Sequence, residues 1–348
     1  MRKRAISNKT TITVIAVIII IALAGIVYYY YYSGVGPAAT KNKMAMIISG
    51  PVNDNDYEAL GLQALQAVGK STGITTAYSE NVNPADLDTA VSQYVSQGFN
   101  IIWVHGAEFA SAVGPGVSDN GTASKNPNIR FILETDVPPA QIRSNVWVID
   151  RNYIPGMYAV GAAAALATHT GTIAYVGALK LPFSLAEANA IILAAHATNS
   201  SVKVLRYWTG DFFDPVKASS ATQALVGQGA DVIINSLNLG YYGIVQVINN
   251  THTLVTAKYT DKISSAPHNQ LTAFVFNFTG PLNYVYSQIN GGTYSGTYKL
   301  KFGTDNYLKL PLTNAASSLS SRIQTIVSQL ESGATTVPFN TTDPGAGP

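Results

Sequence analysis

Aromatic and acidic side chains cluster in a polar turn that could bind a ring-bearing small molecule. The run Asp-Phe-Phe-Asp-Pro at 211–215 places two rings just before a predicted helix. The second acid suits the cap of that helix, and the proline suits its first turn. An aromatic residue is as often part of a core, but this turn is polar, so Phe212, Phe213 and Trp208 are candidate ligand contacts.

Other polar loops follow apolar runs, where an open α/β sheet binds its ligands. The segment 50–57 follows the first run, and the segment 105–109, beginning with His105, follows another. Asn235 and Asn238 come at the end of a later run. These loops are expected to line a common site.

The sequence offers little support for catalysis. The five histidines show no HExxH or HxH spacing, and there is no Cys for thiolate chemistry or thiolate metal binding. Neither a G-x-S-x-G elbow nor a phosphate-binding G-x-x-x-x-G-K loop occurs. We therefore predict a binding protein without a cofactor or a catalytic metal.

Composition favours an extracellular protein. Charged residues make up only 11% of the chain, and the net charge of +2 argues against nucleic acid as a partner. Asn120, Asn199, Asn249, Asn277 and Asn340 each begin an N-glycosylation sequon. Glycosylation at these sites would suit an archaeal or eukaryotic cell surface.

The N-terminal region predicts a membrane anchor. Residues 11–32 carry no charge and follow a basic segment at 1–10. As a helix this run would span a hydrocarbon core of about 30 Å, with its basic end in the cytoplasm. A cleaved secretory signal is the alternative, and residues 3–7 also resemble an archaeal pilin-type signal. In each case residues 33–43 would form a linker to an outward-facing domain.

Beyond this linker, short apolar runs alternate with helical patterns. The runs at 100–104, 128–133 and 232–234 are typical of buried strands. Strands separated by helices favour βαβ units and a parallel sheet. The pattern restarts near residue 155, and because two such sheets exceed one ordinary core, we predict an α/β protein with two lobes and a cleft between them.

Several motifs occur together in a set order. They are the segment 211–218, the run at 227–234, Arg-Asn-Tyr at 151–153 and Gly-Thr-Ile-Ala-Tyr-Val-Gly at 171–177. Over about residues 44–332 this ordered set resembles the basic membrane protein family, the purine-nucleoside-receptor-like solute-binding proteins of ABC transporters. The resemblance implies the two-lobed type I periplasmic-binding-protein fold, in which the chain crosses between the lobes three times and a ligand is held at the hinge.

On this basis we place the crossings near 150–155, 250–257 and 278–281. The expected first lobe is 44–150 plus about 257–278, and the second is 151–256 plus about 279–335, followed by a loose tail at 336–348. A hairpin formed by 299–302 and 307–310 is expected on the second lobe.

The resemblance also assigns roles to residues. Asp54 would bond a base or ribose edge, Tyr57 would stack on a ring, and Glu58 stands where the family has Asn. Asp54 and Asp261, the latter at the position of the family's ribose-binding acid, are expected to face one cavity with Tyr57 and Phe212. The alternative for Asp54, or for its neighbour at 56, is a simple helix cap.

Further roles follow from the same resemblance. Phe212 matches the aromatic residue that packs a purine ring, His105 could donate to a ligand hydroxyl, and Asn277 could face the cleft. A cleft-facing Asn277 could not also be glycosylated, and His105 could equally be a structural residue. Arg151 is expected to fasten the hinge rather than to touch the ligand.

The implied function is capture of a nucleoside-like solute and its delivery to an ABC permease with a cytoplasmic ATPase. Two alternatives remain. One is a sugar-binding ABC receptor, because sugars also use stacked aromatic rings with Asp and Asn. The other is a sensory receptor of the same fold without transport.

We predict that residues 11–32 anchor the protein as a single-pass membrane protein with its folded domain outside, because the run matches a bilayer and no Cys is available for lipidation. Full-length protein should remain in the membrane fraction after a salt wash and appear in solution only with detergent. Recovery in the salt-washed soluble fraction would contradict the anchor.

Overall fold

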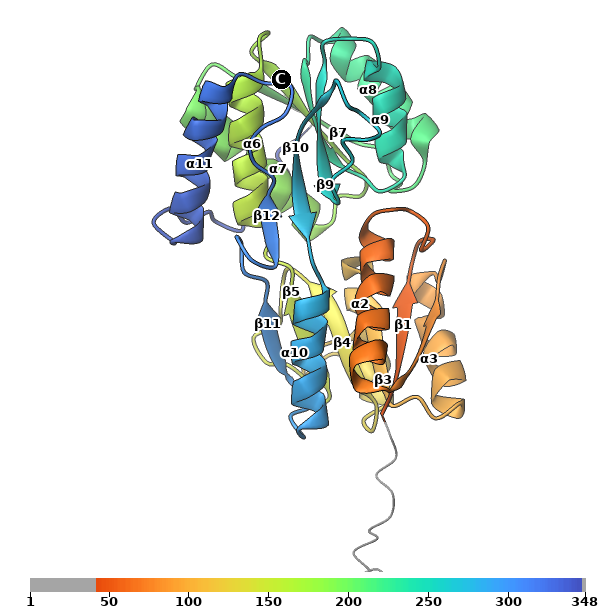
Figure 1. Cartoon of the computed structure of the whole chain (residues 1–348). Helices are drawn as coiled ribbons and strands as arrows, with labels where there is room; N and C mark the ends of the chain where they lie inside the picture. The colour runs from red at the N-terminus through yellow and green to blue at the C-terminus, as the bar shows by residue number, and fades with distance from the viewer. Residues whose placement is uncertain (1–41, 346–348) are drawn as a thin grey trace, which may run out of the picture. The chain divides into compact units, whose positions relative to one another are not determined.

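The computed structural model describes residues 42–345, and in that part of the chain two six-stranded sheets form the framework (Figure 1). The first sheet has the order β11-β5-β4-β3-β1-β2, and the second has the order β12-β10-β9-β8-β6-β7. Within each sheet five strands are parallel and share the 2-1-3-4-5 order of doubly wound folds. A late strand then adds to one edge, β11 in parallel and β12 antiparallel. The two-lobed α/β architecture expected from the sequence is confirmed.

The strands of the first sheet are β1 (Lys43–Ile48), β2 (Thr75–Ser79), β3 (Ile101–His105), β4 (Arg130–Thr135), β5 (Val146–Asp150) and β11 (Gly296–Lys299). Those of the second sheet are β6 (Thr172–Gly177), β7 (Lys203–Trp208), β8 (Val232–Ser236), β9 (Leu254–Tyr259), β10 (Gln270–Phe276) and β12 (Asn306–Leu308). Central strands such as β3 and β8 are buried along their whole length, which explains why they are unbroken apolar runs.

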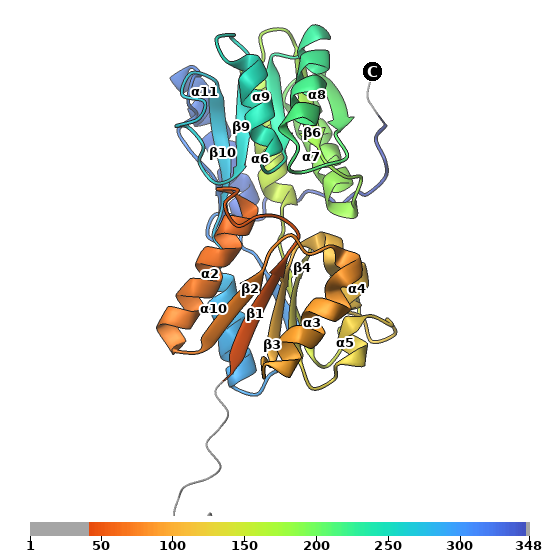
Figure 2. The ribbon, with the colours of Figure 1, turned by 90° about the vertical axis from the view of Figure 1, so that its right-hand side faces the viewer.

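Helices cover both faces of each sheet (Figure 2). In the first lobe, α2 (Tyr57–Thr72) and α10 (Thr279–Asn290) lie together on one face, and α3 (Leu87–Ser96), α4 (Ala110–Val113) and α5 (Thr122–Lys125) belong to the other. In the second lobe, α8 (Pro215–Gly227) pairs with α9 (Gly240–Ile248), while α6 (Ile154–Ala167) packs on α7 (Pro182–Thr198) and α11 (Ser317–Glu331). Short 3-10 turns occur at η1 (Pro84–Asp86) and η2 (Ala107–Phe109).

The α6–α7 contact explains the alanine-rich sequence of both helices. Nearly all of α6 is buried, so small side chains let its backbone approach α7 closely. A Cβ added at Gly161 would meet the Cα of Ile191 at 2.8 Å, and one at Gly156 would meet the ring of Phe274 at 2.0 Å. Both glycines are therefore required by packing rather than by backbone conformation.

Three crossings connect the lobes, and their backbones are bonded to one another. The first is the segment after β5, the second lies between β10 and α10, and the third runs from β11 to β12. Leu300 N donates to Asp150 O at 2.8 Å, and Asn306 Nδ2 donates to Arg151 O at 3.1 Å. Asn152, in the left-handed region at φ 48°, donates to Leu300 O at 2.9 Å. The hinge is thus a small hydrogen-bonded bundle.

Two expectations about the crossings are wrong. Strand β9 pairs with β8, and β10 pairs with β9, all in the second sheet. Residues 257–276 therefore belong to the second lobe, and no crossing occurs at 250–257. The expected hairpin does not form either, because β11 adds to β5 in the first sheet while β12 adds to β10 in the second. The segment between them is the third crossing, and α10 with β11 completes the first lobe.

The chain end differs in part from the loose tail that the sequence suggests. Residues 336–345 form no helix or strand, but they lie along the second lobe. Asn189 Nδ2 donates to Asn340 O and Thr342 O, both at 2.8 Å, and Lys180 Nζ pairs with Asp343 at 2.7 Å. Residues 346–348 lie outside the described part.

The predicted anchor at 11–32 also lies outside the described residues, together with the segment 1–10 and most of the linker at 33–43. Among residues 42–345, no helix combines the length and the apolar character needed to cross a membrane.

An equivalent asparagine fastens each lobe just before its fifth strand. Asn145 Nδ2 donates to the carbonyl oxygens of Ala123, Asn126 and Ile129, at 3.1, 3.1 and 2.9 Å. In the second lobe, Asn269 Nδ2 bonds three carbonyls of the α9–β9 loop in the same way. In each lobe, one buried asparagine amide therefore fixes the loop that leads into the fourth strand, β4 in the first lobe and β9 in the second.

We predict that Asn145→Ala lowers the free energy of unfolding by about 1 to 3 kcal/mol, because it leaves buried carbonyls without a donor. Chemical denaturation followed by circular dichroism measures the change. The control is Asn290→Ala, which removes one exposed side-chain bond and should stay within about 0.5 kcal/mol of the parent. Equal stability of the two variants would contradict the role of Asn145.

Candidate functional site

A cavity of about 20 Å³ lies between the lobes, at the carboxyl ends of strands from both sheets. Its lining comes from the loops and first helical turns that follow β1, β3, β6, β7 and β8, from the end of β9 and from the first crossing. In sheets of this order, the loops after β1 and β3, and after β6 and β8, flank the point where strand order reverses and where ligands bind. The lining residues are Ser49, Tyr57, Glu58, Glu108, Arg151, Phe183, Phe212, Phe213, Asn238 and Tyr259.

Wider hollows occur elsewhere in residues 42–345. One of about 600 Å³ lies at the opposite end of the second sheet, near His169, Asp231 and His252, and another of about 320 Å³ lies behind the hinge near Asp150. Neither lies at the carboxyl ends of strands from both sheets. The interlobe cavity has that position and the highest concentration of aromatic and ionisable side chains, so it is the stronger candidate despite its size.

Five aromatic rings from both lobes line the cavity. Phe212 lies nearly parallel to Phe183, with ring centroids 6.4 Å apart, and contacts Phe213 edge to face at 6.3 Å. From the other lobe, Tyr57 approaches Tyr259 with centroids 5.0 Å apart. Phe213 also crosses to the first lobe, because a Cβ at Gly50 would meet its ring at 2.3 Å. Rings on both walls are suited to enclosing a flat ligand.

Two carboxyl groups face the same cavity from the first lobe. Glu58 is buried, and its Oε1 accepts a hydrogen bond from Gly50 N at 3.0 Å. Glu108 Oε1 accepts from Ser49 Oγ at 2.5 Å. Burial, followed by the charge of Glu108, raises the pKa of Glu58 well above its usual range. The cavity therefore offers both hydrogen-bond acceptors and, where a carboxyl is protonated, a donor.

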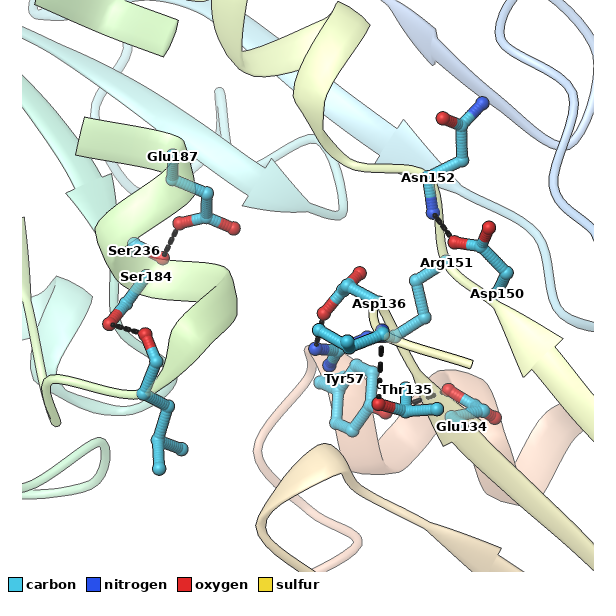
Figure 3. A network of polar contacts seen from close by, with 12 residues as sticks. Tyr57, Glu134, Thr135, Asp136, Asp150, Arg151, Asn152, Ser184, Glu187 and Ser236 are labelled. Atoms are coloured by element: carbon cyan, nitrogen blue, oxygen red, sulfur yellow. Dashed lines mark hydrogen bonds and ion pairs between the residues drawn. The ribbon is translucent and has the colours of Figure 1, made fainter. Parts of the chain in front are cut away.

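Arg151 supplies the positive charge of the cavity (Figure 3). Its guanidinium bonds Asp136, and the side chains of both residues are almost completely buried. The same guanidinium lies over the rings of Tyr153 and Phe183, at 4.3 and 4.7 Å from their centroids. Arg151 thus fastens the hinge, as expected from the sequence, and also lines the cavity, which was not expected.

A second buried ion pair supports the wall formed by the second lobe. Lys258 Nζ lies 2.5 Å from Glu187 Oε1 and donates to Ser236 Oγ at 2.9 Å. Glu187 also accepts bonds from Ser236 Oγ at 2.8 Å and Tyr175 OH at 3.0 Å (Figure 3 shows Glu187 and Ser236). The ammonium of Lys258 lies 4.9 Å from the ring centroid of Tyr259, which lines the cavity. This network therefore supports the cavity wall, although Lys258 and Glu187 do not line the cavity themselves.

The role suggested for His105 is wrong. The imidazole is buried, with Nδ1 2.5 Å from Glu134 Oε1 and Nε2 2.9 Å from Tyr57 O, so neither nitrogen is free for a ligand hydroxyl. Its ring stacks on Tyr57 at 4.0 Å, and Tyr57 OH donates to Glu134 at 2.7 Å. His105 therefore positions the Tyr57 ring that lines the cavity.

Asp54 acts as a helix cap. Its buried carboxylate accepts the backbone N–H groups of Asp56, Glu58 and Ala59, at 2.8, 3.1 and 3.0 Å. It also accepts from Asn238 Nδ2 across the lobes at 3.3 Å. Asp54 therefore bonds Asn238, which lines the cavity, but does not line the cavity itself.

Asp261 does not share the cavity with Asp54, so that prediction is wrong. Its carboxylate pairs with Lys309 and accepts from Gln270 Nε2 at 2.7 Å, and the residue is exposed. The neighbouring lysine, Lys262, instead reaches across the lobes and lies 2.9 Å from Asp56 Oδ1. With Thr260 Oγ1 donating to Asn55 O at 2.9 Å, these contacts hold the lobes together beside the cavity.

Three other candidates from the sequence lie away from the cavity lining. Asn235 bonds both the N–H and the carbonyl of Leu237 and so shapes the turn after β8. Trp208 packs beside Tyr175, with centroids 6.1 Å apart. Asn277 is exposed and accepts the N–H of Thr279 at 2.9 Å, which leaves the residue accessible as a sequon but not as a cleft contact.

The structure thus brings Tyr57, Phe212, Phe213 and Asn238 together, and it adds residues that sequence reasoning missed. Tyr259 ends β9, Glu108 lies in η2 after β3, and Glu58 and Phe183 lie in the first turns of α2 and α7, all on the carboxyl side of the sheets. In the sequence, each of these residues is distinguished only by its position at the end of a strand or in the segment that follows one. Singling them out also requires knowing which side chains turn toward the other lobe.

Two mainly parallel sheets joined by three crossings, with a cavity between them, define the two-lobed periplasmic-binding-protein fold. The solved structure of an ABC transporter solute-binding protein from Aeropyrum pernix has the same fold, with a TM-score of 0.73 at 13% identity over 86% of this chain and 94% of that one. The chain belongs to the Bmp family of PnrA-like ABC transporter substrate-binding proteins, whose model matches residues 41–324.

Named relatives in other organisms are similar over most of the chain. A purine-binding protein of Brucella abortus is 26% identical over 245 residues, which are 70% of this chain and 67% of that protein. An ABC transporter nucleoside-binding protein of Lactococcus lactis is 22% identical over 329 residues, which are 87% of this chain and 91% of that protein.

We predict that the protein becomes more stable as pH falls from about 7 toward about 4. Burial raises the pKa of Asp56 to about 7 and that of Asp150 to about 6. Both values exceed the roughly 3.9 of an unfolded aspartate, so the folded protein binds more protons in this window and gains stability on acidification. The hydrogen bond from Lys125 lowers the pKa of Asp88. Protonation of Asp88 would therefore destabilise the folded protein, but only at pH values below the usual pKa of an aspartate.

Chemical denaturation at a series of pH values measures this effect. The gain should exceed about 1.4 kcal/mol, the free energy of a tenfold change in a protonation equilibrium. Asp56→Asn should reduce the slope, whereas Asp86→Asn, at an exposed position, should not. Stability that falls steadily on acidification through the window would contradict the assignment.

Proposed function

We propose that this protein captures a purine nucleoside in its interlobe cavity and presents it to an ABC permease driven by a cytoplasmic ATPase. The observation that carries the proposal is the group of rings from both lobes around carboxyl and amide groups. Tyr57 comes from the first lobe, and Phe212, Phe213 and Tyr259 come from the second. Flat heterocycles stack on such rings, and the polar groups can bond their edges. The printed names of the two relatives, purine-binding and nucleoside-binding, support this ligand class.

Binding requires the lobes to separate. Small-molecule sites usually measure about 300 to 1,000 Å³, whereas the interlobe cavity measures about 20 Å³. Hinge motion about the three crossings is the established way in which such two-lobed proteins open. Closure would then bring Phe212 and Asn238 of one lobe against a ligand resting on Tyr57 of the other.

We further propose that the domain works outside the cell, tethered by residues 11–32. The five sequon asparagines are all exposed on the folded domain, which is compatible with glycosylation at an outer surface. The tether would keep the domain near its permease without a lipid anchor, in line with the absence of Cys from the chain.

A thermal-shift screen of residues 41–348 tests the ligand class with adenosine, guanosine, inosine, the free bases and glucose. A ligand at 100 times its dissociation constant should stabilise the protein by about 2.7 kcal/mol. A response to nucleosides supports the proposal. A response to glucose alone would replace it with sugar binding, and no response to any nucleoside would overturn it.

We predict that Phe212→Ala weakens nucleoside binding at least tenfold, because loss of a stack of roughly 1 to 3 kcal/mol corresponds to about 5- to 150-fold in affinity. Isothermal titration calorimetry measures the change. The control is Tyr207→Ala, which removes an exposed ring on β7 that does not line the cavity. Equal affinities of the two variants, with both folded, would assign Phe212 to packing alone.

A further inference from the structure

Glu58 leaves one buried oxygen without a partner. The residue is 1% exposed and lies in the first turn of α2, where Oε1 accepts the N–H of Gly50 at 3.0 Å. No group in residues 42–345 bonds Oε2, and the side chain lines the interlobe cavity. Buried polar atoms are nearly always bonded, so an unpartnered oxygen at a cavity wall indicates a group that a ligand satisfies.

The charges around Glu58 favour its neutral form. Glu108 shares the cavity, Asp54 lies in the loop just before α2, and Glu134 acts on Glu58 from β4. The one cation that lines the cavity, Arg151, is bonded to Asp136. Since neighbouring acids and burial both oppose ionisation, a proton is retained at Glu58 more readily than in water.

The geometry also indicates which oxygen carries that proton. A backbone N–H points at Oε1, which must therefore act as an acceptor. The proton of a neutral Glu58 then resides on Oε2, directed at the cavity. Glu108 differs, because its Oε1 accepts the hydroxyl of Ser49 at 2.5 Å, so its carboxyl acts as a hydrogen-bond acceptor in this cavity.

We propose that Glu58 binds the ligand as a neutral carboxylic acid, donating from Oε2 to a ring or carbonyl acceptor while Glu108 accepts an adjacent N–H. This inference rests on the proposed nucleoside function and deepens it. The matching ligand edge has an acceptor beside a donor, as adenine has at N7 and its 6-amino group. Glu58 thereby makes ligand capture stronger in acid and weaker as the pH rises through the range in which the residue ionises.

The competing reading is that an ionised Glu58 accepts from a ligand N–H. The two readings predict opposite results for Glu58→Gln, because an amide can keep its oxygen on Gly50 N and present an NH₂ donor to the cavity. The amide thus mimics the neutral acid and cannot mimic the carboxylate. It also has nearly the same shape, so the fold of the variant is preserved.

The test is calorimetry with adenosine, and in parallel guanosine, from about pH 5 to about pH 9, the range in which buried carboxyl groups titrate. Parent affinity should fall as the pH rises. Glu58→Gln should retain the acid-pH affinity within about threefold and lose the pH dependence, whereas Glu58→Ala should bind at least tenfold more weakly, as expected for a lost buried bond of about 1 to 3 kcal/mol. Glu331→Gln, at an exposed site on α11, is the matched control and should behave as the parent.

Two results would overturn the assignment: affinity of the parent that rises with pH, or Glu58→Gln binding as weakly as Glu58→Ala. The comparison of the parent with Glu58→Gln decides the question even if the alanine variant does not fold. Failure of the parent to bind either nucleoside is a different outcome, which overturns the proposed function and this inference with it.

Discussion

The buried ion pair between Arg151 and Asp136 is the interaction on which the site depends. Arg151 belongs to the first crossing and Asp136 to the loop after β4, so the pair fixes the hinge to the first lobe at the edge of the cavity. Leaving either charge unpaired in the interior would cost about 3 to 5 kcal/mol. Because the guanidinium also lies over Tyr153 and Phe183, the same pair sets the position of rings on the second lobe.

Other buried charges extend this arrangement outward from the hinge. Lys258 and Glu187 are paired within the second lobe behind Tyr259, and Asp56 and Lys262 are paired between the lobes. Each ion is held by residues from different strands or loops, so the walls cannot shift independently without separating a pair. Cavity shape is therefore controlled by electrostatic pairing below the surface, while the surface itself presents mainly aromatic rings and the carboxyl groups of Glu58 and Glu108.

Much of the fold follows from the sequence because buried parallel strands are continuous apolar runs. The runs in β3, β4 and β8 identify themselves in this way. The sheet to which each strand belongs cannot be predicted in the same way, because an apolar run does not indicate which strand it pairs with. That is why residues 257–278, which include β10, are expected in the first lobe. It is also why 299–302 and 307–310 are expected to form a hairpin, although β11 and β12 join different sheets.

The site is less predictable for a different physical reason. Position at a strand end can be read from sequence, and it correctly brings Tyr57, Phe212 and Asn238 near one cavity. The hydrogen-bond partner of a polar side chain is harder to predict, because nearby backbone groups compete with a ligand for that side chain. Asp54 is saturated by three N–H groups of its own loop and helix, and His105 by Glu134 and a carbonyl, so both are positioned well and yet unavailable.

Opening of the lobes, which the proposed function requires, would couple to the protonation of buried carboxyl groups. Asp56 and Glu58 lie at the lobe interface or its cavity, and burial raises the pKa of each. Separating the lobes would return water to these carboxyl groups and lower both pKa values toward their usual range. By linkage, a fall in pH would then shift the balance toward the closed arrangement. Several carboxyl groups are buried where the lobes meet, so lobe closure would respond to pH although the chain carries few charges.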